Sequence, residues 1–303
     1  MMIALLVTML AADHGYGPVD PVLLPDVAVT REDGKAVRLR DLTAGKRTAV
    51  QFIFTHCPTA CPLLGSLFGK VQKSLDSDDG ALLSITVDPE RDTPERLSEW
   101  HKQFGTSARW TVVRPDSAVL RQLLETFGQK DGPPSGHALE VFYVDAESRY
   151  VARTTDLPRA AGIANALSGR TEVAGINVRA VHEAADLPND ASGEAIYHRA
   201  EGVVPRIGGE VLAARAARCA NCHGEQGEGR VEGALTAAPL HRRELTGPQS
   251  RRGGPASSYS RDSFCRSLRT GVDPAGIMFS AAMPRYTLSE ESCTALWDFV
   301  TRK

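Results

Sequence analysis

The sequence lacks a surplus of charge of either sign. It has 35 Lys and Arg residues against 37 Asp and Glu residues, for a formal net charge of −2 over 303 residues. No global electric field therefore draws the chain toward nucleic acid or an anionic membrane, and we expect neither as a partner. Internal repeats are also missing, and the length allows two domains that each bury their own core.

The apolar segment at the N-terminus is short. It covers residues 2–12, and the chain becomes polar at Asp13. This segment is too short to span a bilayer comfortably. It resembles an export signal that ends in small residues, although no Lys or Arg precedes it, which leaves the true start of the chain open. We expect residues 1–20 to direct export to the periplasm, with membrane association if the segment stays uncleaved. A buried N-terminal strand or helix is the alternative.

Cysteine is scarce, and its six copies fall into three pairs. The pairs are Cys57 with Cys61, Cys219 with Cys222, and Cys265 with Cys293. In an oxidising compartment such as the periplasm, cysteines form disulfides, bind metal or carry haem. For Cys265 and Cys293 we expect a disulfide that braces the loop between two helices, with two separate buried thiols as the alternative.

Hydrophobic patterning predicts two domains joined by a linker. Residues 21–170 alternate short β-rich runs with helical patterns, which predicts an α/β domain with a central sheet and helices on its faces. Residues 171–192 lose this periodicity and indicate a linker. Residues 193–303 are rich in Ala, Gly and Arg, show no convincing strand and predict a small all-α domain.

The expected elements are short. Strands are predicted at 48–54, 81–87, 110–113, 141–144 and 150–152. Helices are predicted at 62–75, 94–104, 117–127, 208–218, 263–269 and 289–301. The Gly- and Ser-rich stretch 251–258 indicates a flexible surface loop.

One motif in the second domain predicts a covalently attached haem. Cys219-Ala220-Asn221-Cys222-His223 has the C-x-x-C-H pattern, in which two thiols form thioethers to haem and the His reaches the iron. A redox or zinc pair followed by a chance His is the alternative. A downstream Met would complete the iron ligands and raise the reduction potential. Met283 is the first candidate for this iron ligand, and Met278 is the alternative.

Residues 193–303 resemble the small bacterial class I cytochromes c. The resemblance rests on the C-x-x-C-H motif, the glycine-rich run 224–229, the run 268–276 and Met283-Pro284 before a helix. It implies that Cys219 and Cys222 hold haem c covalently. It also implies His223 as the proximal and Met283 as the distal iron ligand.

The pair Cys57 and Cys61 lies at an expected strand-to-helix turn. The positive end of a helix favours thiolate there, as in thioredoxin-like proteins. The C-x-x-x-C spacing, one residue longer than the usual redox pair, gives two sulfurs room to face one metal. Two thiolates and an imidazole suit copper. His137, just before the strand at 141–144, is the candidate imidazole, although a lone His is ordinarily a surface or core residue.

Residues 21–170 resemble the Sco/SenC family of copper-binding assembly factors. The cysteine pair, the run Val87-Asp88-Pro89-Glu90-Arg91-Asp92-Thr93-Pro94 and the late His137 carry the resemblance. Thr59 and Ala138 stand where family members often have an acidic residue and Ser. The resemblance implies a thioredoxin-like fold and copper bound by Cys57, Cys61 and His137. Its implied role is maturation of the copper centre of cytochrome c oxidase, whose copper-centre subunit is then the expected partner.

Within this domain, three polar residues near the cysteines have expected structural roles. Asp88 and Asp92 are expected to cap and orient the turn before the helix at 94–104, and hydrogen bonds near the cysteine site are the alternative. His56, directly before Cys57, is expected to face solvent.

Two tethered redox sites meet at high effective concentration. We therefore expect the haem to pass electrons to or from the thiol and copper site, and to exchange electrons with other periplasmic carriers. One alternative is an enzyme, a thiol:disulfide oxidoreductase or peroxide reductase that uses the haem as its electron port. A second alternative is a plain electron carrier whose first domain has become a docking module.

Overall fold

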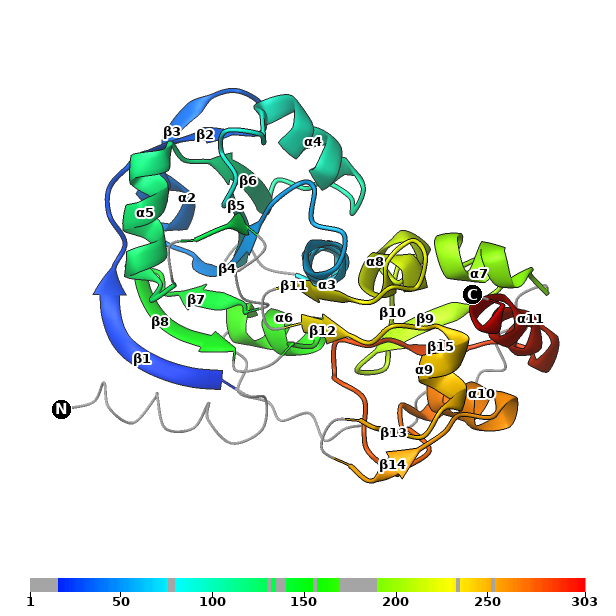
Figure 1. The fold of residues 1–303 in the computed structure, drawn as a ribbon. Coiled ribbons are helices and arrows are strands. Elements are labelled where there is room, and N and C mark those ends of the chain that lie inside the picture. Colours follow the sequence, from blue (N-terminus) through cyan, green and yellow to red (C-terminus); the bar gives the residue numbers. More distant parts are fainter. Residues whose placement is uncertain are drawn as a thin grey trace. The chain divides into compact units, whose positions relative to one another are not determined.

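The chain folds into two units, Met1–Val173 and Ala174–Lys303, which we term the N-terminal and C-terminal units. The computed structural model describes residues 16–75, 80–129, 132–134, 140–154, 157–168, 190–232, 235–251 and 254–302. Figure 1 shows the helices and strands of both units. None of the helices in these ranges is both long enough and apolar enough to cross a membrane.

The described part of the N-terminal unit is built on one sheet of eight strands in the order β1-β8-β7-β4-β5-β6-β2-β3. β4 is parallel to β5 and β5 to β6, whereas the remaining pairs are antiparallel. The strands are β1 (Tyr16–Leu23), β2 (Ala28–Arg31), β3 (Ala36–Arg38), β4 (Arg47–Ile53), β5 (Gly80–Thr86), β6 (Trp110–Arg114), β7 (Phe142–Val144) and β8 (Arg149–Thr154).

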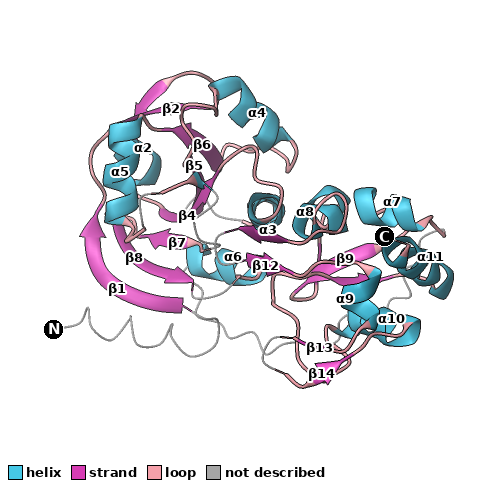
Figure 2. Ribbon diagram, in the orientation of Figure 1, coloured by secondary structure: helices cyan, strands magenta, loops and turns pink. Residues whose placement is uncertain are grey.

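The centre of this sheet is covered on both faces. Every residue of β5 is buried, as is every residue of β4 after Arg47, which is typical of parallel strands with helices on both sides. α6 lies against β4 and β5 and also contacts α3, and α4 contacts β6 (Figure 2). The helices are α2 (Leu39–Thr43), α3 (Ala60–Ser74), α4 (Pro94–Lys102), α5 (Ser117–Thr126) and α6 (Ala160–Ser168).

The C-terminal unit is mainly helical, with short strands between the helices. α7 (Gly193–Arg199) packs on α11 (Glu290–Thr301), and a Cβ at Gly193 would lie 2.1 Å from the Ala295 carbonyl oxygen, so this close approach needs glycine. Ser289 caps α11 by accepting the Ser292 N–H at 3.0 Å. The other helices are α8 (Cys219–His223), α9 (Arg242–Thr246), α10 (Arg261–Thr270) and the 3₁₀ turn η2 (Ala214–Ala216).

The predicted fold class is confirmed for both domains, but two details of the C-terminal prediction were wrong. The helix expected at 208–218 is absent, because Gly208 and Gly209 adopt φ of +57° and +87° and turn the chain into a hairpin. The prediction that this domain contains no strands is also wrong, because short strands are present. They are β9 (Val204–Ile207), β10 (Glu210–Val211), β11 (Arg230–Glu232), β12 (Leu235–Ala237), β13 (Gln249–Ser250), β14 (Ala256–Ser257) and β15 (Arg285–Thr287).

Candidate thiol and haem sites

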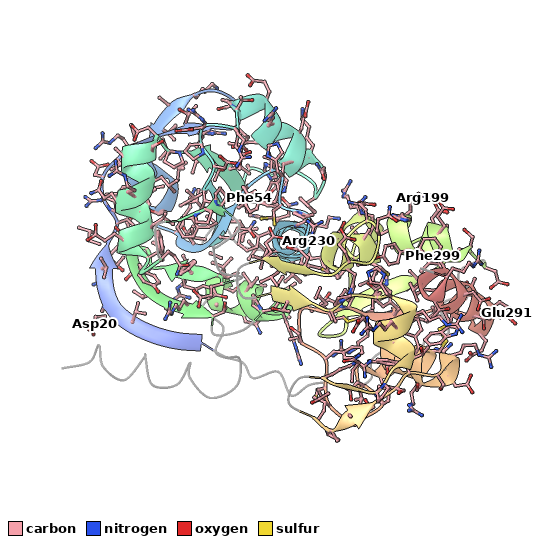
Figure 3. All side chains as sticks on the ribbon, in the orientation of Figure 1. Asp20, Phe54, Arg199, Arg230, Glu291 and Phe299 are labelled. Carbon is pink, nitrogen blue, oxygen red and sulfur yellow. A yellow bond between two sulfur atoms is a disulfide. The ribbon has the colours of Figure 1, made fainter. Side chains whose placement is uncertain are left out.

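The first cysteine pair lies in the turn that joins β4 to α3. Phe54, labelled in Figure 3, follows β4, and its carbonyl oxygen accepts the Cys57 N–H at 3.1 Å. The Cys61 N–H, in the first turn of α3, donates to Cys57 Sγ at 3.2 Å. Both side chains are buried. The start of the helix therefore holds the two thiol-bearing residues next to each other, four positions apart.

The fully buried carboxylate of Asp92 holds this turn next to β5. Asp92 Oδ2 accepts the Thr55 N–H at 3.1 Å, and the same carboxylate accepts the hydroxyls of Thr55 and Thr86. Thr86 is the last residue of β5. Asp92 thereby connects β5 to the segment that leads into Cys57.

The expected capping role of the two aspartates needs correction. The cap of α4 is Thr93, whose hydroxyl oxygen accepts the Arg96 N–H at 3.4 Å. The Asp88 carbonyl oxygen accepts the Asp92 N–H at 2.9 Å and so shapes the loop before the helix. Asp92 orients the cysteine turn instead of the helix, because its carboxylate points to Thr55.

We predict that Asp92→Asn lowers the free energy of unfolding of the N-terminal unit by about 2 to 3 kcal/mol, because an amide cannot accept all the hydrogen bonds of this buried carboxylate. Urea titration followed by tryptophan fluorescence measures the change, since Trp100 and Trp110 lie in this unit. The matched control is Asp116→Asn. Asp116 caps α5, and Asn caps a helix as well as Asp, so its effect should stay within about 0.5 kcal/mol. Equal losses in both variants contradict the assignment.

The imidazole predicted to complete the thiol site cannot be placed, because His137 lies outside the described residues. In the ranges that are described, no three His, Cys, Asp or Glu side chains form a group able to hold a metal. His56 is exposed, as expected, with its Nδ1 3.3 Å from the Thr55 hydroxyl and 3.7 Å from Asp92 Oδ1. The cysteine pair itself supplies two soft donors, which fit copper.

The second cysteine pair lies on α8, in the C-x-x-C-H segment. His223 Nδ1 lies 2.7 Å from the Ala238 carbonyl oxygen, so Nδ1 carries the proton and Nε2 keeps its lone pair for a metal. Burial lowers the pKa of His223, against a smaller opposing effect of the Ala238 hydrogen bond. Burial, reinforced by Cys222, raises the pKa of the Cys219 thiol to about 12. The imidazole is therefore neutral at pH 7, the form that binds iron.

Two buried tyrosine hydroxyls hold the ends of this segment. Tyr286 donates to the Ala217 carbonyl oxygen and Tyr197 to the Gly224 carbonyl oxygen, each at 2.7 Å. Burial raises the pKa of both phenols, so both stay protonated donors. Phe299, labelled in Figure 3, packs against the Tyr197 ring with centroids 5.4 Å apart. Sequence reasoning missed both tyrosines, because each acts on a distant part of the chain.

The glycine-rich run after His223 forms a turn whose backbone conformation favours glycine. Gly224, Gly227 and Gly229 have φ of +82°, +80° and +82°. A Cβ at Gly224 would lie 2.3 Å from the Glu228 carboxyl carbon. The Gly229 N–H donates to the His223 carbonyl oxygen at 2.8 Å, which folds the run back on α8.

The two candidate methionines differ in their surroundings. Met283 is half-buried in the loop before β15, and its N–H donates to the Ser280 carbonyl oxygen at 3.0 Å. Met278 is 70% exposed and forms an isolated bridge with Val272. Both lie in the segment closed by a disulfide between Cys265 and Cys293, so the disulfide expected there is present.

Comparison with known proteins gives a family match for each of the two parts of the chain. Residues 23–171 match the SCO1/SenC family model and residues 209–302 match the cytochrome c model. The Arabidopsis thaliana protein named "Protein SCO1 homolog 1, mitochondrial" is 38% identical over 81 residues, which are 25% of this chain and 24% of the plant protein. The "SCO1 protein homolog" of Bacillus subtilis is 36% identical over 78 residues, 25% of this chain and 40% of that protein. The matched segments thus span less than half of either relative.

A solved structure adds a comparison of the fold. Bradyrhizobium japonicum ScoI, solved with copper bound, is 25% identical, and the match covers 48% of this chain and 96% of that one with a TM-score of 0.40.

Proposed function

Because residues 23–171 belong to the SCO1/SenC family and residues 209–302 to the cytochrome c family, we propose that this chain is a copper-handling assembly protein with its own electron-transfer domain. One observation carries the proposal. The Cys61 N–H donates to Cys57 Sγ at 3.2 Å, so the start of α3 holds two soft sulfur donors together. Copper is the cargo, bound by Cys57, Cys61 and His137. Its destination is the copper centre of cytochrome c oxidase.

The C-terminal unit binds haem c in this proposal. Cys219 and Cys222 form the two thioethers, and His223 and Met283 are the axial ligands. The hydrogen bond from His223 Nδ1 to the Ala238 carbonyl oxygen supports this assignment, because it leaves Nε2 available and orients the ring. The bound haem supplies transfer of one electron at a time.

The two sites are linked by the redox state of the cysteines. Thiolate sulfur binds copper, whereas the sulfurs of a Cys57–Cys61 disulfide cannot serve as thiolate ligands. Reducing that disulfide consumes two electrons and two protons and gives two thiols. A one-electron haem must therefore deliver electrons twice, and other periplasmic carriers supply them.

The proposed location is the periplasm. The disulfide between Cys265 and Cys293 supports it, because such bonds persist in oxidising compartments. The apolar segment 2–12 is the proposed export signal.

We predict that His137→Ala abolishes copper binding but leaves thiol exchange at Cys57 and Cys61 intact. An imidazole is required for the metal and not for disulfide exchange. Copper content after loading and the rate of disulfide exchange with a small dithiol measure the two properties. Copper-loaded and copper-free wild type should also differ in the kinetics of haem reduction. Unchanged copper content in His137→Ala contradicts the copper site as proposed.

A thiol:disulfide oxidoreductase is the second candidate function. The same first-turn placement of Cys61 beside Cys57 Sγ favours it, because helix starts are common sites of reactive thiols. Normal exchange activity in a wild-type protein that binds no copper would establish this reading. Absence of both copper binding and exchange would leave a plain electron carrier with a docking domain.

A further inference from the structure

Two arginines lie directly opposite each other in the small sheet of the C-terminal unit. β9 and β15 are antiparallel, and their register pairs Arg206 with Arg285. Residues in direct register lie on the same face of a sheet, and like charges placed this way destabilise the pair of strands. A bound negative charge would offset this repulsion.

The same two arginines line a pocket of about 370 Å³ together with a third arginine. The lining residues are Arg206, Arg269, Arg285, Tyr286, Thr287 and Leu288. Arg269 Nη1 lies 2.8 Å from Glu290 Oε1, but Glu290 is 73% exposed. Within the described part of the chain, neither Arg206 nor Arg285 has a carboxylate partner. Three guanidinium groups and one carboxylate leave two positive charges without a counter-charge.

The Arg285 side chain is held in place rather than free in solvent. Its guanidinium carbon lies 5.6 Å from the centre of the Phe279 ring, and Nη1 donates to the Met283 carbonyl oxygen. A Cβ at Gly271 would lie 1.7 Å from Arg285 Nε, so the absence of a side chain there makes room for this guanidinium.

Among the described residues, most donors of the paired arginines have no hydrogen-bond acceptor. A guanidinium has five N–H donors in a rigid fork. Arg206 uses Nη1 to reach the Gly209 carbonyl oxygen at 3.3 Å, and Arg285 uses Nη1 to reach the Met283 carbonyl oxygen. This geometry matches carboxylate and phosphate oxygens, which such forks bind bidentately.

We propose that Arg206, Arg269 and Arg285 form a binding site for oxyanion groups that together carry about two negative charges. The two sources of this chemistry are free inorganic phosphate and the two carboxylates of the haem side chains. The phosphate source is independent of the proposed function, whereas the haem source rests on it.

The test is thermal unfolding of the haem-loaded full chain in phosphate and in chloride at equal ionic strength. Wild type is compared with Arg206→Gln and Arg285→Gln, and with Arg266→Gln as the control, because Arg266 is exposed on α10 outside the pocket. For free phosphate, we expect the Tm of wild type to rise with phosphate concentration and this rise to weaken at least tenfold in both pocket variants. In chloride, Arg206→Gln should match or exceed wild type, because it removes the repulsion.

The haem source gives a different pattern. Phosphate then leaves the Tm of wild type unchanged, and the pH dependence of the haem reduction potential shifts in Arg206→Gln and Arg285→Gln but not in Arg266→Gln. The proposal is overturned if phosphate has no effect and the potentials of all three variants follow wild type. If Arg206→Gln is at least as stable as wild type in chloride but less stable than wild type in phosphate, the difference reflects anion binding and not a loss of packing.

Discussion

Replacing Cys57 and Cys61 with Ser is expected to reduce copper binding from one equivalent per chain to background, while the haem spectrum stays unchanged. Soft sulfur donors bind copper strongly, and hydroxyls are hard, weak donors that stay protonated at neutral pH. The two cysteines belong to the N-terminal unit and the C-x-x-C-H segment to the C-terminal unit, so the proposed haem attachment should not depend on them. Elemental analysis after loading with copper in each oxidation state, together with paramagnetic resonance of the cupric form, measures the effect.

The matched control for this pair is His56→Ala. His56 lies in the same turn, is exposed and has a ring nitrogen able to bind metal, yet it is not among the proposed ligands. The control should retain full copper content. If His56→Ala lost copper and Cys57→Ser retained it, the copper ligand would be His56 and not Cys57. Circular dichroism of each variant establishes that the buried Cys-to-Ser changes leave the sheet folded.

Met283→Ala is expected to lower the haem reduction potential by on the order of 0.1 V or more, whereas Met278→Ala leaves it within experimental error. A thioether ligand stabilises the reduced iron, and axial ligands set haem potentials over roughly 0.8 V. Met283 is half-buried in a loop fixed by the Ser280 carbonyl oxygen, and Met278 is largely exposed. Redox titration and visible spectra of both variants measure the difference.

The two methionines serve as each other's controls. They lie in the same disulfide-closed segment, so a general disturbance of this segment affects both variants alike. A lower potential in Met278→Ala alone would transfer the ligand role to Met278. A potential unchanged in both variants would remove the methionine ligand altogether.

Local patterns were enough to predict the strand and helix around the first cysteine pair and the helix that carries Cys293. β4 and β5 are buried on both faces, so their continuous β-rich runs stood out in the sequence. Ser289 marked the start of α11 because capping is a property of four adjacent residues. The C-x-x-C-H motif likewise depends on residues within one turn of helix.

The missed features depend on residues far apart in the chain. Tyr286 reaches Ala217 across 69 positions, and no local pattern marks such a contact. The opposed pair Arg206 and Arg285 exists only because β15 joins β9 in one register. The helix expected at 208–218 failed for a local reason, since alanine-rich composition outweighed the turn signal of Gly208-Gly209 in the prediction.

The disulfide between Cys265 and Cys293 has a consequence for how electrons must be supplied. In the chain-entropy account, closing its 28-residue segment stabilises the fold by about 3 to 4 kcal/mol, so the C-terminal unit benefits from keeping this pair oxidised. The proposed loading of copper has the opposite requirement, because Cys57 and Cys61 must then be reduced. A diffusible thiol reductant is not directed to one pair by binding to the chain, whereas an electron donor that docks on the chain can serve one pair alone. The same protein then keeps sulfur in two oxidation states within one compartment.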